Sequence, residues 1–203
     1  GVCTGAVEFI IDLTSQKAVI QDVLTLTRAA VEGRLNTRAD ASKHQGDFRK
    51  IVEGVNDTLD AVIVPLNVAA GYVDRISKGD IPEKITDTYY GDFNTIKNNL
   101  NSCIDAVNAL VADANMLSKA AVEGRLNTRA DTSKHQGDFR KIVEGVNDTL
   151  DAVIGPLNVA ARYVDDISRG DIPAKITDNY NGDFNTIKNN LNQCIDAVNA
   201  LVA

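Results

Sequence analysis

The two histidines are the residues of this chain that can take part in the most kinds of reaction. An imidazole can act as a base, bind a metal ion or accept a phosphoryl group near neutral pH. His44 and His135 are each followed by Gln-Gly. A phospho-accepting histidine would lie on a helix and be followed by Glu or Asp, and a metal-binding histidine would have a second ligand nearby. We therefore expect exposed or capping roles for both, and we predict no metal site.

Carboxylates are the second reactive group. Four of them follow a Gly and precede an apolar run: Asp47, Asp92, Asp138 and Asp183. No nucleophile accompanies them, so they are better explained as helix caps than as general bases. We predict no catalytic residue and no cofactor, and therefore no enzyme.

The three cysteines are scattered, at Cys3, Cys103 and Cys194. They form neither a disulfide framework nor a metal-binding motif, which favours a reducing compartment. Cys103 and Cys194 fall at positions of a heptad-spaced row of apolar residues, the seam of a coiled coil. We expect them to be small core residues there, with disulfide cross-linking as the alternative.

Composition excludes several classes of protein. The 203 residues are 44% hydrophobic but only 5% aromatic, which favours long helices over a sandwich or barrel. A net charge of −7 argues against a nucleic-acid partner, whose phosphates require Lys and Arg. No apolar run reaches about 18 residues, so we expect no direct membrane contact within this segment. The start lacks a basic leader and an initiator Met, so we expect no secretory signal and a longer parent chain.

A long internal repeat dominates the sequence. Residues 29–112 align without gaps with residues 120–203, and 75 of the 84 pairs are identical. A weaker repeat lies within each copy, and Gly-Asp-Phe occurs four times, ending at Phe48, Phe93, Phe139 and Phe184. The chain therefore consists of four units of about 45 residues in the order A-B-A-B.

Heptad spacing predicts long helices and an all-α fold. After Phe48, apolar residues recur at steps of four and three, at Val52, Val55, Leu59, Val62, Leu66, Ala69, Val73 and Ile76. This spacing is the seam of a coiled coil. Pro65 and Pro156 fall inside the seam, where either a kink or the first turn of a new helix would accommodate them. We expect these prolines and the four Phe residues to be packing positions of the coiled coil.

Glycines indicate where the helices end. Four of them can take the left-handed conformation that closes a helix: Gly33, Gly79, Gly124 and Gly170. Twelve or thirteen residues separate each of these glycines from the Asp of the following Gly-Asp-Phe, whereas an antiparallel helix pair needs only about 2–8 linking residues. Such a connector can run back along the first helix, so we predict parallel helices. Apolar connector residues could anchor it against the helices: Ile81, Ile85, Ile172, Ile176, Leu35 and Leu126.

Two parallel helices with one seam each cannot bury both seams within one chain. A second copy would complete a parallel four-helix bundle. We therefore predict a parallel homodimer of four coiled-coil bundles stacked end to end.

The pattern resembles the tandem HAMP domains of bacterial chemoreceptors and sensor kinases over about residues 20–203. In that family the first helix opens with Pro and ends in Gly-Asp-aliphatic, as in the segments that begin at Pro65 and Pro156 and end in Gly79-Asp80-Ile81 and Gly170-Asp171-Ile172. The second helix opens with an acidic residue and carries a later Asn, as at Asn56, Asn101, Asn147 and Asn192. The A units lack the Pro and the acidic step. The resemblance implies divergent HAMP units at 18–63 and 113–154, and typical ones at 64–112 and 155–203.

The first 17 residues resemble the last strand of a PAS sensor domain. Residues 5–14 are largely apolar and end in Asp-Leu-Thr, which predicts a short N-terminal β-strand. The resemblance implies that Asp12 and Thr14 tie the end of this strand to the outgoing helix.

These resemblances imply a non-enzymatic relay segment in the cytoplasm, in which the prolines and phenylalanines named above also act as relay positions. It would pass conformational change from an upstream sensor to a downstream signalling domain in the same chain. The repeated GRLNTRAD and HQGDFRKIVEGVN segments are most similar to methyl-accepting chemotaxis proteins, which implies a role in chemotaxis. Whether the parent protein is a membrane receptor stays open. Two alternatives stay open, namely a passive dimeric spacer and the HAMP array of a two-component histidine kinase.

Overall fold

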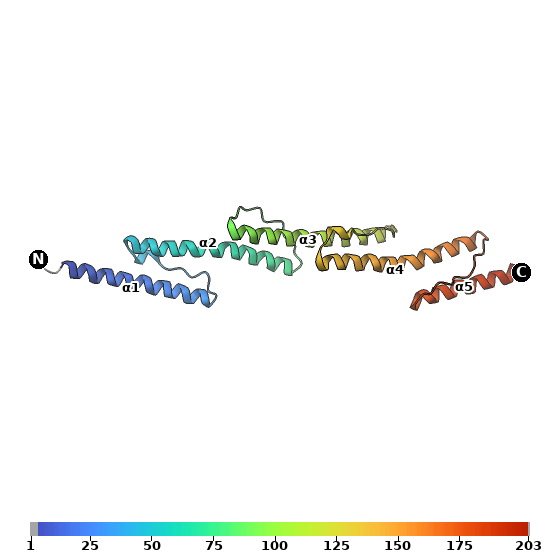
Figure 1. Ribbon diagram of the computed structural model, residues 1–203, viewed down its shortest axis with the longest axis horizontal. Helices are drawn as coiled ribbons and strands as arrows, with labels where there is room; N and C mark the ends of the chain where they lie inside the picture. Colours follow the sequence, from blue (N-terminus) through green and yellow to red (C-terminus); the bar gives the residue numbers. More distant parts are fainter. Residues whose placement is uncertain (1–3, 203) are drawn as a thin grey trace. The chain divides into compact units, whose positions relative to one another are not determined.

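The computed structural model describes residues 4–202, with side chains from residue 14 onward (Figure 1). The described residues form α-helices and two short 3₁₀ helices, without a β-strand. The α-helices are α1 (Thr4–Val31), α2 (Gly46–Ser77), α3 (Gly91–Val122), α4 (Gly137–Ser168) and α5 (Gly182–Val202). The 3₁₀ helices are η1 (Ala41–Lys43) and η2 (Thr132–Lys134). The all-α fold class is confirmed.

The chain divides into two compact halves, residues 1–104 and 105–203, which are described separately. Within each half a connector runs back beside the helix it follows, so that the next helix points the same way (Figure 1). In the N-terminal half α1 contacts α2, and in the C-terminal half α4 contacts α5. Both halves therefore contain parallel helix pairs, as the connector length predicted.

The connectors are of two kinds. The RLN connectors, named after Arg-Leu-Asn near their start, are residues 32–45 and 123–136. The DIP connectors, named after Asp-Ile-Pro, are residues 78–90 and 169–181. RLN connectors lie in the segments predicted to be divergent units and contain the 3₁₀ helices, whereas DIP connectors lie in the segments predicted to be typical units.

Each connector begins at a glycine in the left-handed conformation. The φ angles are 75° at Gly33, 78° at Gly79, 73° at Gly124 and 86° at Gly170. The amide of the next residue then reaches back to the helix, as from Asp80 to the carbonyl of Arg75 at 3.0 Å. This Schellman closure satisfies carbonyls that the helix end would otherwise leave without a donor.

The predicted caps differ from what the structure shows. The α2 helix begins at Gly46, which has a φ of 54°, and its N-cap is Gln45 without a side-chain hydrogen bond. Asp47 lies in the first turn and accepts a 3.0 Å hydrogen bond from Lys50. The other aspartates also lie in first turns: Asp92, Asp138 and Asp183. Because the glycine itself turns the chain into the helix, each Asp comes too late to cap, although its charge suits the helix dipole.

The prolines lie inside continuous helices. Pro65 is within α2 and Pro156 is within α4, so no new helix begins there. Proline has no amide hydrogen, so the carbonyl of Ala61, four residues before Pro65, lacks its usual helical donor. Because it is continuous, α2 is the second helix of the first unit and the first helix of the second.

The β-strand predicted at the start of the chain is wrong. Residues 4–14 belong to α1. A lone strand would leave its backbone donors and acceptors unpaired, whereas a helix pairs them within the segment. Cys3 and the side chain of Asp12 lie outside the described part of the protein, so the PAS exit role of Asp12 and Thr14 stays a prediction.

The core of each half is narrow. In the N-terminal half its buried apolar residues include Val19, Leu26, Ala29, Val52, Ile63, Ile85 and Ile104. In the C-terminal half they are Ala120, Ala130, Val143, Ile154, Ile176 and Ile195. Ile81 and Ile172 are half-buried, whereas Leu35 and Leu126 are exposed and anchor little.

Candidate functional site

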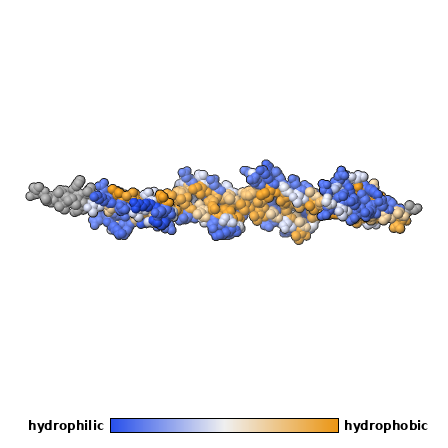
Figure 2. Space-filling model, turned by 90° about the horizontal axis from the view of Figure 1, so that it is seen from below, coloured by the Kyte–Doolittle hydropathy of each residue, from blue (hydrophilic) through white to orange (hydrophobic). Residues whose placement is uncertain are grey.

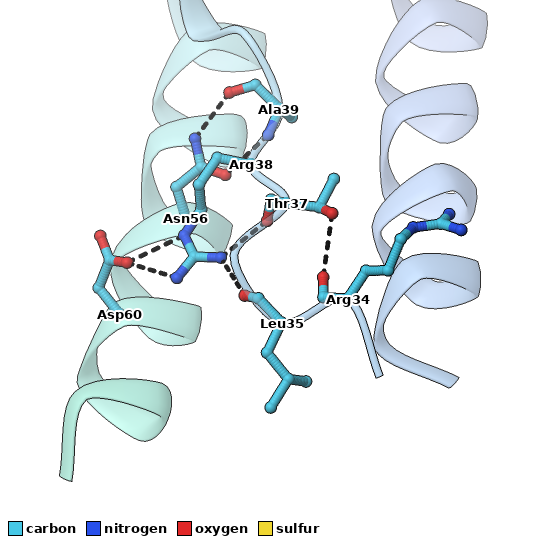
Figure 3. A network of polar contacts seen from close by, with 7 residues as sticks. All are labelled: Arg34, Leu35, Thr37, Arg38, Ala39, Asn56 and Asp60. Atoms are coloured by element: carbon cyan, nitrogen blue, oxygen red, sulfur yellow. Dashed lines mark hydrogen bonds and ion pairs between the residues drawn. The ribbon is translucent and has the colours of Figure 1, made fainter. Parts of the chain in front are cut away.

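An asparagine on the second helix of each unit holds the connector. The side-chain oxygen of Asn56 accepts from the amide of Ala39 at 3.1 Å, and its NH₂ donates to the carbonyl of Ala39 at 2.8 Å (Figure 3). The other units repeat this pair at 2.8–3.0 Å, in Asn101 with Ile85, Asn147 with Ala130 and Asn192 with Ile176. Two-point pairing fixes one connector residue at one height along the helix.

An arginine adds a second tie in the RLN connectors. The Arg38 guanidinium donates to Asp60 on α2 through Nε at 2.9 Å and Nη2 at 2.5 Å (Figure 3). Its Nη1 donates to the carbonyls of Leu35 and Thr37, both at 2.7 Å. Arg129 makes the same fork with Asp151 in the C-terminal half. The arginine therefore shapes its own loop and fastens that loop to the second helix.

Both histidines are buried, so of the two predicted roles, exposed or capping, the exposed one is wrong. His44 is 6% exposed and His135 is 4% exposed. Nε2 of His44 lies 2.7 Å from Oδ2 of Asp22 on α1, and Nε2 of His135 lies 2.7 Å from Oδ2 of Asp113 on α3. Each histidine is also the C-cap residue of its 3₁₀ helix. The histidine thus ties the connector to the first helix of the unit.

The DIP connectors place an aromatic side chain where the RLN connectors place histidine. Tyr89 stands two residues before the glycine that starts the next helix, as His44 does. It lines a small apolar pocket together with Pro65, Val68, Ile85 and Phe93. The fourth unit repeats this pocket with Tyr180, Pro156, Val159, Ile176 and Phe184. The structure therefore brings Pro65 together with Phe93 and Pro156 together with Phe184. All four phenylalanines, including Phe48 and Phe139, are half-buried.

Two charged residues in the connectors shape turns. The pKa of Asp40 is lowered because the Ser42 hydroxyl and then the Ser42 amide donate to its carboxylate, at 2.6 and 3.1 Å. The pKa of Asp80 is lowered because Arg75 donates to it at 2.6 Å. Both carboxylates are exposed.

Among the described residues, no group of three or more His, Cys, Asp or Glu side chains could hold a metal ion. Every buried side-chain nitrogen and oxygen in that part of the chain has a hydrogen-bond partner. Between residues 4 and 202 no helix combines the length and the apolar character that crossing a membrane requires.

One face of the helices is apolar and uncovered. In the N-terminal half, the seam residues Val62, Leu66 and Val73 are 42%, 40% and 55% exposed. In the C-terminal half, an open groove between α3 and α4 is lined by Leu110, Ala114, Leu117, Ile142 and Val146. Figure 2 shows that exposed hydrophobic residues gather in patches. Large patches of this kind mark interaction surfaces.

Comparison with known families agrees with this geometry. The HAMP domain family matches residues 43–109 and residues 134–200, which together make up about two thirds of the chain. Each match contains a whole DIP connector and the long helix before it, and begins near the end of an RLN connector. No solved structure matches the chain.

Proposed function

The chain belongs to the HAMP domain family, whose members relay signals within receptors, and we propose that it is a four-unit relay segment of a bacterial chemoreceptor. In this proposal it passes conformational change from an upstream sensor to a downstream signalling domain of the same chain. The segment works in the cytoplasm and performs no catalysis.

The proposal counts the divergent units, residues 18–63 and 113–154, as HAMP units. The shared connector geometry supports this assignment, since Asn56 pairs with Ala39 just as Asn101 pairs with Ile85. Both kinds of connector also leave the first helix through a left-handed glycine and begin the next helix at another.

The exposed seam is the observation that carries the proposal. Residues with the heptad spacing of a coiled-coil core, such as Leu66 and Val73, are uncovered in the single chain. A parallel second copy would place the same residues opposite one another and bury them, which is how helical seams gain most of their stability. The free cysteines Cys103 and Cys194 share this exposure.

The native cysteines provide the test of the dimer. In chains that retain only Cys103 or only Cys194, mild oxidation should give a disulfide-linked dimer, since a parallel arrangement places each cysteine beside its counterpart. A chain with Asn98→Cys as its single cysteine is the control, because position 98 lies off the seam and should cross-link poorly. Equal linkage at all three positions, or none at Cys103 and Cys194, would contradict a parallel seam.

The relay itself needs the full-length protein. If the segment transmits a signal, the cross-linking rates at Cys103 and Cys194 should change when the upstream sensor is stimulated. Unchanged rates together with an unimpaired output would instead indicate a passive dimeric spacer. The sequence that follows this segment separates the two receptor classes, because a chemoreceptor continues into a long heptad hairpin and a histidine kinase into an ATP-binding module.

A further inference from the structure

We propose that the two His–Asp pairs, each formed by a buried histidine of an RLN connector and a partly exposed aspartate of the preceding helix, are latches that make each divergent unit move as one body. The proposal deepens the relay function and rests on it for its meaning in signalling. Its structural content concerns His44 with Asp22 in the N-terminal half, and His135 with Asp113 in the C-terminal half.

The first step is the continuity of the polar contacts. Asp22 on α1 accepts from His44 in the connector, since a carboxylate can only accept and Nε2 must therefore carry the hydrogen. The same connector is tied to α2 through Arg38 with Asp60. Specific hydrogen bonds therefore run from the first helix through the connector to the second helix.

The second step is what the typical units have at the same place. Val68 stands eleven residues before Gly79, just as Asp22 stands eleven residues before Gly33. Val68 and Tyr89 line one apolar pocket, so an apolar contact replaces the hydrogen-bonded pair. The second helix is still held, because Asn101 pairs with Ile85.

The third step comes from the internal repeat. Upstream of residue 29 the two copies diverge, and seven of the nine positions in residues 20–28 differ from those in residues 111–119. The two identical positions are Asp22 with Asp113, and Leu26 with Leu117. Leu26 is a buried core residue. The histidine's partner is therefore retained where most of its helix has changed.

The two kinds of contact differ physically. A hydrogen bond to a buried side chain is short and directional, so it holds one register between the helix and the connector. An apolar contact has no preferred direction and tolerates small sliding. A shift of the first helix is therefore passed on rigidly in the divergent units and partly absorbed in the typical ones.

Hydrogen exchange of this chain, followed by mass spectrometry, tests the latch. Asp22→Ala and His44→Ala should each speed exchange in residues 34–45 by about ten-fold, since the first leaves the buried His44 without its partner and the second leaves the half-buried Asp22 carboxylate without one. The double variant should be no faster than the single ones. Exchange in residues 79–90 should not change, and Asp57→Ala, at an exposed position of α2, should have no effect.

Additive effects of the two substitutions, or unchanged exchange in residues 34–45, would overturn the latch. If an alanine variant fails to fold, Asp22→Asn retains an acceptor and Asp22→Val with His44→Tyr installs the apolar pair of the typical units. Backbone amides in residues 34–45 should exchange slowly in the Asp22→Asn variant and fast in the Asp22→Val, His44→Tyr variant. The reverse order would also overturn the proposal. The assay requires neither a sensor nor an output domain, so its result is independent of whether the relay function holds.

Discussion

Asn101 and Ile85 are joined by two hydrogen bonds, at 2.8 Å from the Ile85 amide to Oδ1 and at 3.0 Å from Nδ2 to the Ile85 carbonyl. The asparagine side chain pairs both backbone groups of a connector residue, as a neighbouring strand would in a sheet. Because all four units contain this pair, it is the polar contact that the RLN and DIP connectors have in common.

Asn101→Ala should lower the free energy of unfolding by about 1–3 kcal/mol, because it leaves a half-buried amide and carbonyl without partners. The free energy of unfolding of the Asn101→Asp variant should fall between those of the original protein and the Asn101→Ala variant, since a carboxylate accepts from the amide but cannot donate to the carbonyl. Urea denaturation at one fixed protein concentration measures both. Asn99→Ala is the matched control at an exposed position of the same helix, and an equal loss there would remove any special role for Asn101.

Two glycines on the same stretch of chain should respond to alanine with opposite signs. Gly79 has a φ of 78° and open space around its Cβ position, so Gly79→Ala should cost about 1 kcal/mol through backbone strain alone. Gly71 lies inside α2, also with open space, so Gly71→Ala should stabilise by about 0.5–1 kcal/mol. Thermal unfolding of both variants checks the contrast, and two changes of the same sign would contradict it.

Acid should loosen the turn at η1. The folded-state pKa of Asp40 lies below its ordinary value of 3.8 because Ser42 donates to the charged form. The contribution of this carboxylate to stability is therefore complete above that ordinary value, and it is lost as the pH falls through the folded-state pKa. An NMR titration should show the Ser42 amide signal moving with a midpoint below 3.8. Asp40→Asn should abolish that movement, whereas a midpoint at or above the ordinary value would contradict the cause assigned here.

Ala69→Leu should lock the relay. Ala69 lines the pocket that contains Pro65, Tyr89 and Phe93, and overfilling a packed site typically costs about 1–3 kcal/mol in any arrangement that cannot make room. The bundle should therefore stay in whichever packing accommodates the larger side chain, and the output of the full-length protein should no longer follow the stimulus. Ala70→Leu, at an exposed neighbouring position, should respond normally. A normal response of the Ala69→Leu variant would show that this layer does not switch.

Chain geometry explains which features could be predicted from the sequence. The spacing from Gly33 to Asp47 predicted parallel helices because a connector of that length can run back along a helix, whatever its side chains do. The heptad seam predicted helices but placed the core imperfectly, since Ile63, outside the seam, is buried while Val62 is exposed. Heptad spacing alone does not say which side of a helix faces its own connector.

Contacts between residues that are far apart in the chain could not be predicted from the sequence. His44 and Asp22 are 22 residues apart on different elements, and only the path of the connector brings them together. A signal did exist in the identity of Asp22 and Asp113 across the repeat. The strand over residues 5–14 was predicted from apolar composition without period, which does not separate a buried strand from a helix.

The continuity of α2 restricts how such a chain can change in length. This helix runs from Gly46 to Ser77 and serves two successive units. Each added residue turns everything after it by about 100° about the helix axis, so one insertion between Ile63 and Ala69 would swing the second unit's contact face away from its connector. Additions of about seven residues come close to preserving the phase. Tandem duplication of whole units, as in the repeat seen here, lengthens the chain without that penalty.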